Sequence, residues 1–229
     1  MIDNNCRKQI LDLIAREVVP AVGCTEPMAV ALCVARATEM LGKRPEKITV
    51  MLSANILKNA MGVGIPGTGM IGLPIAIALG ALIGKSEYQL EVLKDLTPET
   101  LEQGKKYMEE GHIDIQLKQG HCDKLYIEAI CGALGDQATA IIATGHTHFV
   151  YEERNGQVNF DRRGGTADEG ETESVALNMK LVHEFATTAP VDEIRFILKT
   201  KEYNLRAAEE SIKGNYGHCL GKTMDRPLS

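Results

Sequence analysis

Aromatic residues make up only 4% of the 229-residue chain, and tryptophan is absent. Proteins that hold single-stranded nucleic acid stack its bases on aromatic side chains, so recognition of that kind is not expected. The net charge of -6 and the lack of an arginine-rich stripe also argue against nucleic acid as a partner. No hydrophobic run reaches the roughly 18 residues of a membrane span, and the amino-terminal segment lacks the apolar core of a secretion signal. We therefore expect a cytoplasmic protein with neither nucleic acid nor a membrane as partner.

The six cysteines form no Cys-x-x-Cys pair, which argues against a zinc ribbon. In a chain without a secretion signal they are expected to stay reduced. Gly145-His146-Thr147-His148 places two histidines at i and i+2, but no third ligand has a suitable spacing, so no metal site is expected. A role for His146 and His148 in hydrogen bonding a substrate remains open. The cysteines are Cys6, Cys24, Cys33, Cys122, Cys131 and Cys219.

Hydrophobic residues make up 44% of the chain, enough for a sizeable core, and their spacing changes along the sequence. Helical spacing dominates up to about residue 110, interrupted by one strand over 47–54, and again after residue 172. Apolar and polar residues alternate from 113 to 153. This order predicts an α+β fold with amino-terminal helices packed on a mainly antiparallel sheet and a helical carboxy-terminal segment. The predicted helices cover 5–19, 24–41, 69–83, 97–110, 173–186 and 191–212, and the strands cover 47–54, 113–117, 125–129, 138–144 and 148–153.

Turn and cap residues divide these elements. Thr25 is the predicted N-cap of the second helix, and Asn155-Gly156 predicts a hairpin turn within a meander of four to five strands. The polar, glycine-rich residues 161–172 predict a mobile loop or linker. We divide the chain into a substrate-binding α+β domain, 1–190, and a carboxy-terminal helix and tail, 191–229.

Cys24 is the first candidate for chemistry, because Gly23-Cys24-Thr25-Glu26-Pro27 ends a loop where a helix begins. Unpaired N–H groups and the helix dipole at such a position stabilise an anion and lower the pKa of a thiol. The other interpretation is a small buried cysteine that packs against the next helix. Spacing alone leaves both open.

A second candidate is the stretch from Ser53 to Gly69, which combines glycines with polar side chains. Glycines let the backbone approach a ligand closely, and their N–H groups can cradle an anion. The stretch is not a nucleotide-binding P-loop, because Lys58 precedes the glycines. A small zwitterion with a carboxylate fits this set better than a nucleotide, although a turn that only lets helices pack closely is the competing interpretation. The candidate binding residues are Ser53, Asn55, Lys58, Asn59, Gly67, Thr68 and Gly69.

Taken together, these motifs resemble the L-cysteine desulfidase family, which is related to the iron–sulfur L-serine dehydratases. The resemblance rests on Pro20-Ala-Val-Gly-Cys-Thr-Glu-Pro27, on Ser53-x-Asn55-x-x-Lys58-Asn59 and on Val63-Gly-Ile-Pro-Gly-Thr-Gly69. Gly214-Asn-Tyr216-Gly217 and Gly221-Lys-Thr223 are similar to the end of the family's first half. Family members are roughly twice as long, and their second half is a helical domain whose cysteines bind a [4Fe-4S] cluster, so the chain resembles the amino-terminal half only.

The resemblance implies a carbon–sulfur lyase of amino-acid catabolism that converts L-cysteine to hydrogen sulfide, pyruvate and ammonia. The cluster would act on the leaving group as a Lewis acid. Cys24 lies at the position of the family's catalytic cysteine and would take the α-proton or shuttle protons. The substrate, L-cysteine or L-serine, would be bound by Thr25 and Glu26, by the polar residues of the second candidate, and by His146 and His148.

The cysteines of this chain do not match a cluster motif, which departs from the full-length pattern. We expect no cofactor in this chain, and we expect it to be a domain or truncated product that is inactive without the second half. Two other functions remain open: a stand-alone amino-acid-binding or regulatory domain, and a relative of the L-serine deaminases. A homodimer is also compatible with the sequence.

Overall fold

The computed structural model describes residues 2–19, 23–163, 175–215 and 219–224. The chain forms two compact units, which are described separately. One unit spans Ala21–Thr166, and the other combines Met1–Pro20 with Ala167–Ser229. These boundaries do not coincide with the predicted domain boundary at residue 190. That boundary divides the chain by expected function and stays a prediction. Within the described residues, no helix is both long and apolar enough to cross a bilayer.

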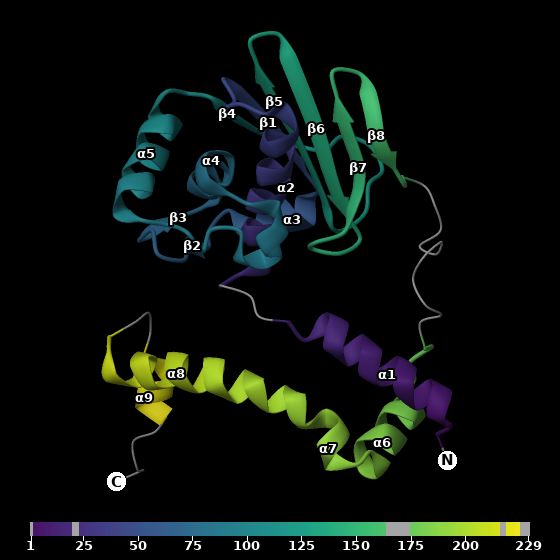
Figure 1. Cartoon of the computed structure of the whole chain (residues 1–229). Helices are drawn as coiled ribbons and strands as arrows, with labels where there is room; N and C mark the ends of the chain where they lie inside the picture. Colours follow the sequence, from purple (N-terminus) through teal and green to yellow (C-terminus); the bar gives the residue numbers. More distant parts are fainter. Residues whose placement is uncertain (1, 20–22, 164–174, 216–218, 225–229) are drawn as a thin grey trace. The chain divides into compact units, whose positions relative to one another are not determined.

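The unit Ala21–Thr166 is built on a six-stranded sheet in the order β4-β1-β5-β6-β7-β8 (Figure 1). Every neighbouring pair is antiparallel except β1 and β4, which are parallel. The predicted α+β class with a mainly antiparallel sheet is therefore confirmed. The strands are β1 (Lys47–Leu52), β4 (Ile113–Leu117), β5 (Tyr126–Ala133), β6 (Asp136–Ala143), β7 (Phe149–Arg154) and β8 (Gln157–Asp161).

Helix α2 (Thr25–Leu41) is the centre of the core. It packs on β5 and β6, while α4 (Leu73–Ile83) packs on α2 and α5 (Pro98–Glu109) packs on α4 (Figure 1). A helix that is apolar on nearly all sides is stable only when it is surrounded, and most of α2 is fully buried. The predicted N-cap of this helix is wrong by one residue: Cys24 has the extended backbone of the cap, because Thr25 already belongs to the first turn.

Small residues set the close approach of α2 and α4. A Cβ added at Gly80 would lie 2.6 Å from the Ala31 carbonyl oxygen, and one at Gly84 would lie 2.7 Å from Ala35 Cβ. Both pairs are four residues apart on their helices, so they share one face of each. Backbone contact across this face lets the two buried helices approach each other closely.

The end of β1 and the start of α4 differ from the sequence prediction. The strand expected to reach residue 54 ends at Leu52, because Ser53 caps the short helix α3 (Ala54–Ala60) and accepts a hydrogen bond from the Ile56 N–H. The helix expected from residue 69 begins at Leu73, because the preceding residues pair as β2 (Gly64–Ile65) and β3 (Met70–Ile71). The expected meander is smaller than the sheet: β5 to β8 form it, and β4 joins β1 instead.

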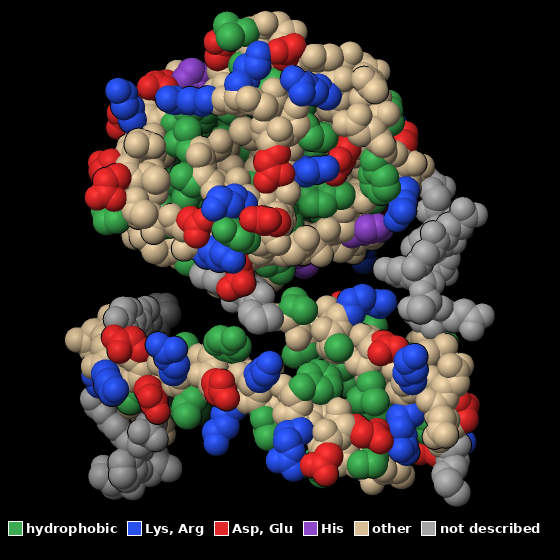
Figure 2. Space-filling view, in the orientation of Figure 1, with side chains coloured by type: hydrophobic (Ala, Val, Ile, Leu, Met, Phe, Trp, Pro, Cys, Tyr) green, Lys and Arg blue, Asp and Glu red, His purple; other side chains and the backbone are tan. Residues whose placement is uncertain are grey.

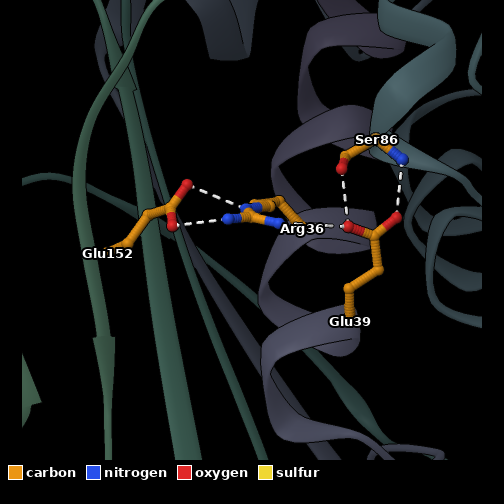
Figure 3. A network of polar contacts seen from close by, with 4 residues as sticks. All are labelled: Arg36, Glu39, Ser86 and Glu152. Atoms are coloured by element: carbon orange, nitrogen blue, oxygen red, sulfur yellow. Dashed lines mark hydrogen bonds and ion pairs between the residues drawn. The ribbon is translucent and has the colours of Figure 1, made fainter. Parts of the chain in front are cut away.

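Arg36 ties α2 to β7 (Figure 3). Its guanidinium donates from Nε and Nη2 to the two carboxylate oxygens of Glu152, at 2.8 and 2.7 Å. Glu39, one turn along α2, accepts hydrogen bonds from the backbone and hydroxyl of Ser86 at the start of the 3-10 helix η1 (Ser86–Glu91). The Glu152 side chain is only 13% exposed, so Arg36 supplies hydrogen bonds that water supplies to an exposed carboxylate.

Replacing Arg36 by methionine is expected to lower the free energy of unfolding by about 2 kcal/mol, because it leaves a largely buried carboxylate without its partner. Urea unfolding followed by circular dichroism measures the change. The matched control is Arg195→Met, which removes a pair with Asp192, whose side chain is 86% exposed. That change should cost less than about 0.5 kcal/mol. Equal effects of the two variants would contradict a structural role for the Arg36 pair.

The second unit is helical in its described residues and has little core. Arg7 on α1 and Glu193 on α7 form an ion pair at 3.6 Å, and the buried hydrophobic side chains are Ile10 and Phe185. Many other apolar side chains on α6 to α8 are exposed, as Figure 2 shows on the surface of these helices. The helices are α1 (Asn4–Glu17), α6 (Met179–Thr188), α7 (Val191–Ile194), the 3-10 helix η2 (Arg195–Leu198), α8 (Lys199–Lys213) and α9 (Leu220–Met224).

The sequence predicted one helix over 191–212, which the structure divides into α7, η2 and α8, and it did not predict the short α9. The helix predicted over 173–186 corresponds to α6, which begins at Met179. Most of the linker predicted over 161–172 lies outside the described residues. The expected homodimer stays a prediction.

Candidate functional site

Five polar side chains from three separate segments meet at the first turn of α2. The Cys24 thiol donates to Glu26 Oε2 at 2.9 Å, and the Thr25 hydroxyl donates to the same oxygen at 3.3 Å. Asn59 of α3 donates to Glu26 Oε1 at 3.2 Å. His146, in the loop between β6 and β7, lies with Nε2 3.3 Å from Thr25 Oγ1. We call these residues the Cys24 cluster; all five are partly exposed.

The glycine-rich hairpin β2–β3 touches the segment that carries Cys24. Gly23 has φ +79°, and a Cβ added there would lie 2.7 Å from Pro66 Cγ. The hairpin and the loop before α2 are therefore in direct contact, and α3, which leads into the hairpin, supplies Asn59. The two motifs singled out in the sequence thus lie side by side. The contact between Pro66 and Gly23 was not predicted from the sequence, because nothing in the sequence around Pro66 indicates which segment it packs against.

Burial and Glu26 together favour the protonated form of Cys24. Burial and the hydrogen bond to Glu26 raise the pKa of the Cys24 thiol, while the hydrogen bond from Cys24 lowers the pKa of the Glu26 carboxyl. A thiol that donates to a carboxylate is stabilised as the thiol, and the carboxylate as the anion. The expectation that the helix start would lower the pKa of Cys24 is wrong, because burial and the hydrogen bond to Glu26 raise it.

Helix α3 turns one polar face outward. Asn55, Lys58 and Asn59 are spaced at i, i+3 and i+4, which places them on one side of the helix. Asn59 contacts Glu26, whereas Asn55 and Lys58 are exposed. Among the residues that the structure describes, neither Asn55 nor Lys58 has a hydrogen bond or ion pair. These two side chains are available to a ligand.

Ser53 and Thr68 have hydroxyls that already serve the fold. Ser53 donates to the Lys124 carbonyl at 2.7 Å while it caps α3. Thr68 is buried, donates to the Ile65 carbonyl at 2.7 Å and accepts from the Met70 N–H at 2.9 Å. The structure places both beside the binding segment as residues that hold its backbone in shape. Their direct contact with a substrate stays a prediction.

Gly67 and Gly69 both have positive φ and form the turn of the hairpin. Gly67 lines a pocket of about 360 Å³ together with mostly apolar residues of the hairpin turn, of the segment between η1 and α5, and of the first turn of α5. Cys24 and Glu26 are not among the residues that line it. The pocket is lined by Pro66, Gly67, Leu93, Lys94, Leu96, Thr97, Pro98 and Leu101.

The two histidines point to different partners. His146 approaches Thr25, whereas His148 Nδ1 lies 2.9 Å from the hydroxyl of Thr144 in its own loop. His146 is therefore brought to the Cys24 cluster, while the contacts of His148 are local. A role of either histidine toward a substrate stays a prediction.

Several thiolates facing one space are needed to hold an iron–sulfur cluster. Cys33 lies in the core and donates to the Ala140 carbonyl at 3.3 Å, and burial raises the pKa of Cys131 to about 12. In the described part of the chain, no group of three or more His, Cys, Asp or Glu residues is arranged to hold a metal ion. The described thiols do not fit such a cluster, so we assign no reaction step to one. That this chain carries no cofactor stays a prediction.

The known proteins with similar sequences are longer than this chain. No family model matches the chain, and no solved structure does. The chain is similar to UPF0597 proteins. It is 63% identical over 218 residues to UPF0597 protein BF3560 of Bacteroides fragilis, which covers 95% of this chain and 51% of that protein. Identity is 64% to the UPF0597 protein of Phocaeicola vulgatus, over 98% of this chain and 52% of that protein.

The similarity extends to less similar relatives: the UPF0597 protein of Porphyromonas gingivalis is 48% identical over 99% of this chain and 54% of that protein. The chain thus spans about half the length of the curated relatives that it matches. The names of these UPF0597 relatives state no activity and no ligand. Any function for the chain therefore has to be argued from its own residues.

Proposed function

We propose that this chain is the substrate-binding half of a cysteine desulfidase-type lyase. The observation that carries the proposal is the Cys24 cluster: a thiol, a carboxylate and an amide from the segments that resemble this family meet at one helix start. A thiol and a carboxylate that interact are a pair suited to moving a proton. The resemblance supplies the reaction, in which L-cysteine and water give hydrogen sulfide, pyruvate and ammonia.

In this proposal each residue has a role that follows from its chemical group. Cys24, once ionised, accepts the α-proton of the amino acid. Glu26, Thr25 and Asn59 hold one charged end of the substrate, and the outward face of α3 holds the other. Lys58 suits the carboxylate, because it is an exposed cation without an ion pair among the described residues. Departure of the β-thiol needs chemistry that these residues do not provide.

The isolated chain is therefore expected to bind L-serine and L-cysteine weakly, in about the millimolar range, and to release no sulfide or pyruvate. Binding of L-serine is measured by NMR titration, and release of the two products is measured after anaerobic iron–sulfur reconstitution. Glu26→Ala should abolish L-serine binding, whereas Glu17→Ala on α1 is the matched control that should leave it unchanged.

Four results would change the proposal. Turnover by the isolated chain, lost in Cys24→Ser, would show that the second half is not required. A failure to bind either amino acid would remove the substrate-binding role. Binding without turnover by a longer protein that carries this sequence would favour an amino-acid-binding or regulatory domain, and pyruvate from L-serine alone would favour a serine deaminase.

A further inference from the structure

Glu26 is an anion that accepts hydrogen bonds from three side chains and has no cationic partner in the part of the chain that the structure describes. Cys24 and Thr25 donate to one carboxylate oxygen and Asn59 donates to the other. None of the ion pairs among the described residues involves Glu26, and the carboxylate is only partly buried. Neutral donors stabilise the charge but do not neutralise it. The carboxylate is therefore poised to bind a cation from solution.

The donors also differ in strength. Glu26 Oε2 is shared by the thiol and the hydroxyl, and a thiol is a weak hydrogen-bond donor. An ammonium group is a strong donor that carries a full charge, so it would replace the thiol in competition for this oxygen. Asn59 can keep its bond to Oε1 meanwhile, which holds the carboxylate in place.

We propose that Glu26 recognises the α-ammonium group of the amino acid and that this ammonium displaces the Cys24 thiol from the carboxylate. The inference rests on the proposed function and names the group that selects an α-amino acid over an acid without the amine. It also links recognition to chemistry. In the free chain burial and the hydrogen bond to Glu26 both favour the protonated thiol of Cys24. In the occupied site an ammonium cation neutralises the carboxylate and lies close to the sulfur.

The displaced thiol then loses its proton to solvent more readily, because a neighbouring anion has been replaced by an ion pair. The base that removes the α-proton is thus formed only when a substrate with an amine is bound. A free thiolate is prone to oxidation, so a site that keeps its cysteine protonated until then is protected. The groups that face Cys24 in this argument are Glu26, Thr25 and, through Thr25, His146.

The experiment measures thiolate at Cys24 directly. Absorbance near 240 nm is titrated against pH for the chain and for Cys24→Ser, and the difference reports the Cys24 thiolate. L-serine is the probe, since it has the ammonium and no thiol. L-glycerate is the matched control ligand, because a hydroxyl stands where L-serine has the ammonium. Saturating L-serine is expected to give at least about threefold more Cys24 thiolate at neutral pH, and L-glycerate to give no increase.

The variant Glu26→Gln separates the inference from the proposed function. It should form thiolate at lower pH than the unchanged chain without any ligand, and L-serine should not shift it further. If NMR shows that L-serine binds but the Cys24 titration does not move, or if L-glycerate moves it equally, the inference is overturned while the binding role stands. If L-serine does not bind at all, the proposed function fails first. The far-ultraviolet circular dichroism of each variant should match that of the unchanged chain.

Discussion

Replacing Gly80 by alanine is expected to lower the free energy of unfolding by about 3 kcal/mol, because overpacking a tight core forces helices apart. The added Cβ would lie 2.6 Å from the Ala31 carbonyl oxygen and 3.0 Å from Ala31 Cα. Both atoms belong to the backbone of α2, so neither can rotate away. Alanine also raises helix propensity by up to about 1 kcal/mol, and the expected loss is net of that gain.

Urea unfolding followed by circular dichroism measures the effect, and Gly62→Ala is the control. Gly62 has open space around the added methyl group, so this substitution should change stability by less than about 0.5 kcal/mol. If Gly80→Ala were as stable as the control, α2 and α4 could not be packed as closely as the structure places them. Such a result would also question the burial of α2, on which the position of Cys24 depends.

Replacing Gly23 by alanine is expected to lower the free energy of unfolding by about 2 kcal/mol. It should also weaken L-serine binding about tenfold, which corresponds to a loss of about 1.4 kcal/mol in the free energy of binding. Gly23 has φ +79°, which an alanine adopts only with strain, and its added Cβ would lie 2.7 Å from Pro66 Cγ. The loop before α2 and the hairpin would have to separate. Cys24 and Glu26 follow Gly23 directly, so the cluster should lose its geometry.

Gly42→Ala is the matched control for this prediction. Gly42 ends α2 with φ +75°, so alanine is strained there too, but nothing lies within 4 Å of the added methyl group. It should cost about 1 kcal/mol and leave L-serine binding unchanged. If both variants bind L-serine equally well, contact between the loop and the hairpin does not matter to the site. Unfolding is measured by circular dichroism and binding by NMR titration.

Local patterns explain why much of the fold could be predicted. The hydrophobic runs fixed α2 and α4 as buried helices, and alternation located β5, β6 and β7 to within a few residues. The Asn155-Gly156 turn is a clear case: the two residues have φ +52° and +79°, which is the geometry that this pair favours between β7 and β8. These patterns depend on residues that are close in the sequence, so they can be recognised without knowledge of the fold.

Pairing between distant segments could not be predicted in the same way. β4 lies parallel to β1, although 60 residues that include the helices α3, α4 and α5 separate them, and nothing in either strand specifies that partner. The helix α3 and the hairpin β2–β3 were missed because they are too short for a periodic pattern. These elements nevertheless place Asn59 and Pro66 against the start of α2.

The candidate site divides along the same line. Residue types and spacing identified Cys24, Lys58 and Asn59 as candidates, and the family resemblance added Glu26. The thiol, ammonium and amide groups have the same basic chemistry in any fold, so the sequence is enough to recognise them. The protonation of Cys24 was decided by folding, because the first turn of α2 points the Glu26 carboxylate at the thiol and α3 adds Asn59 to the same carboxylate. Electrostatic effects fall off steeply with distance, so a pKa follows from which groups meet in space and not from which groups the chain contains.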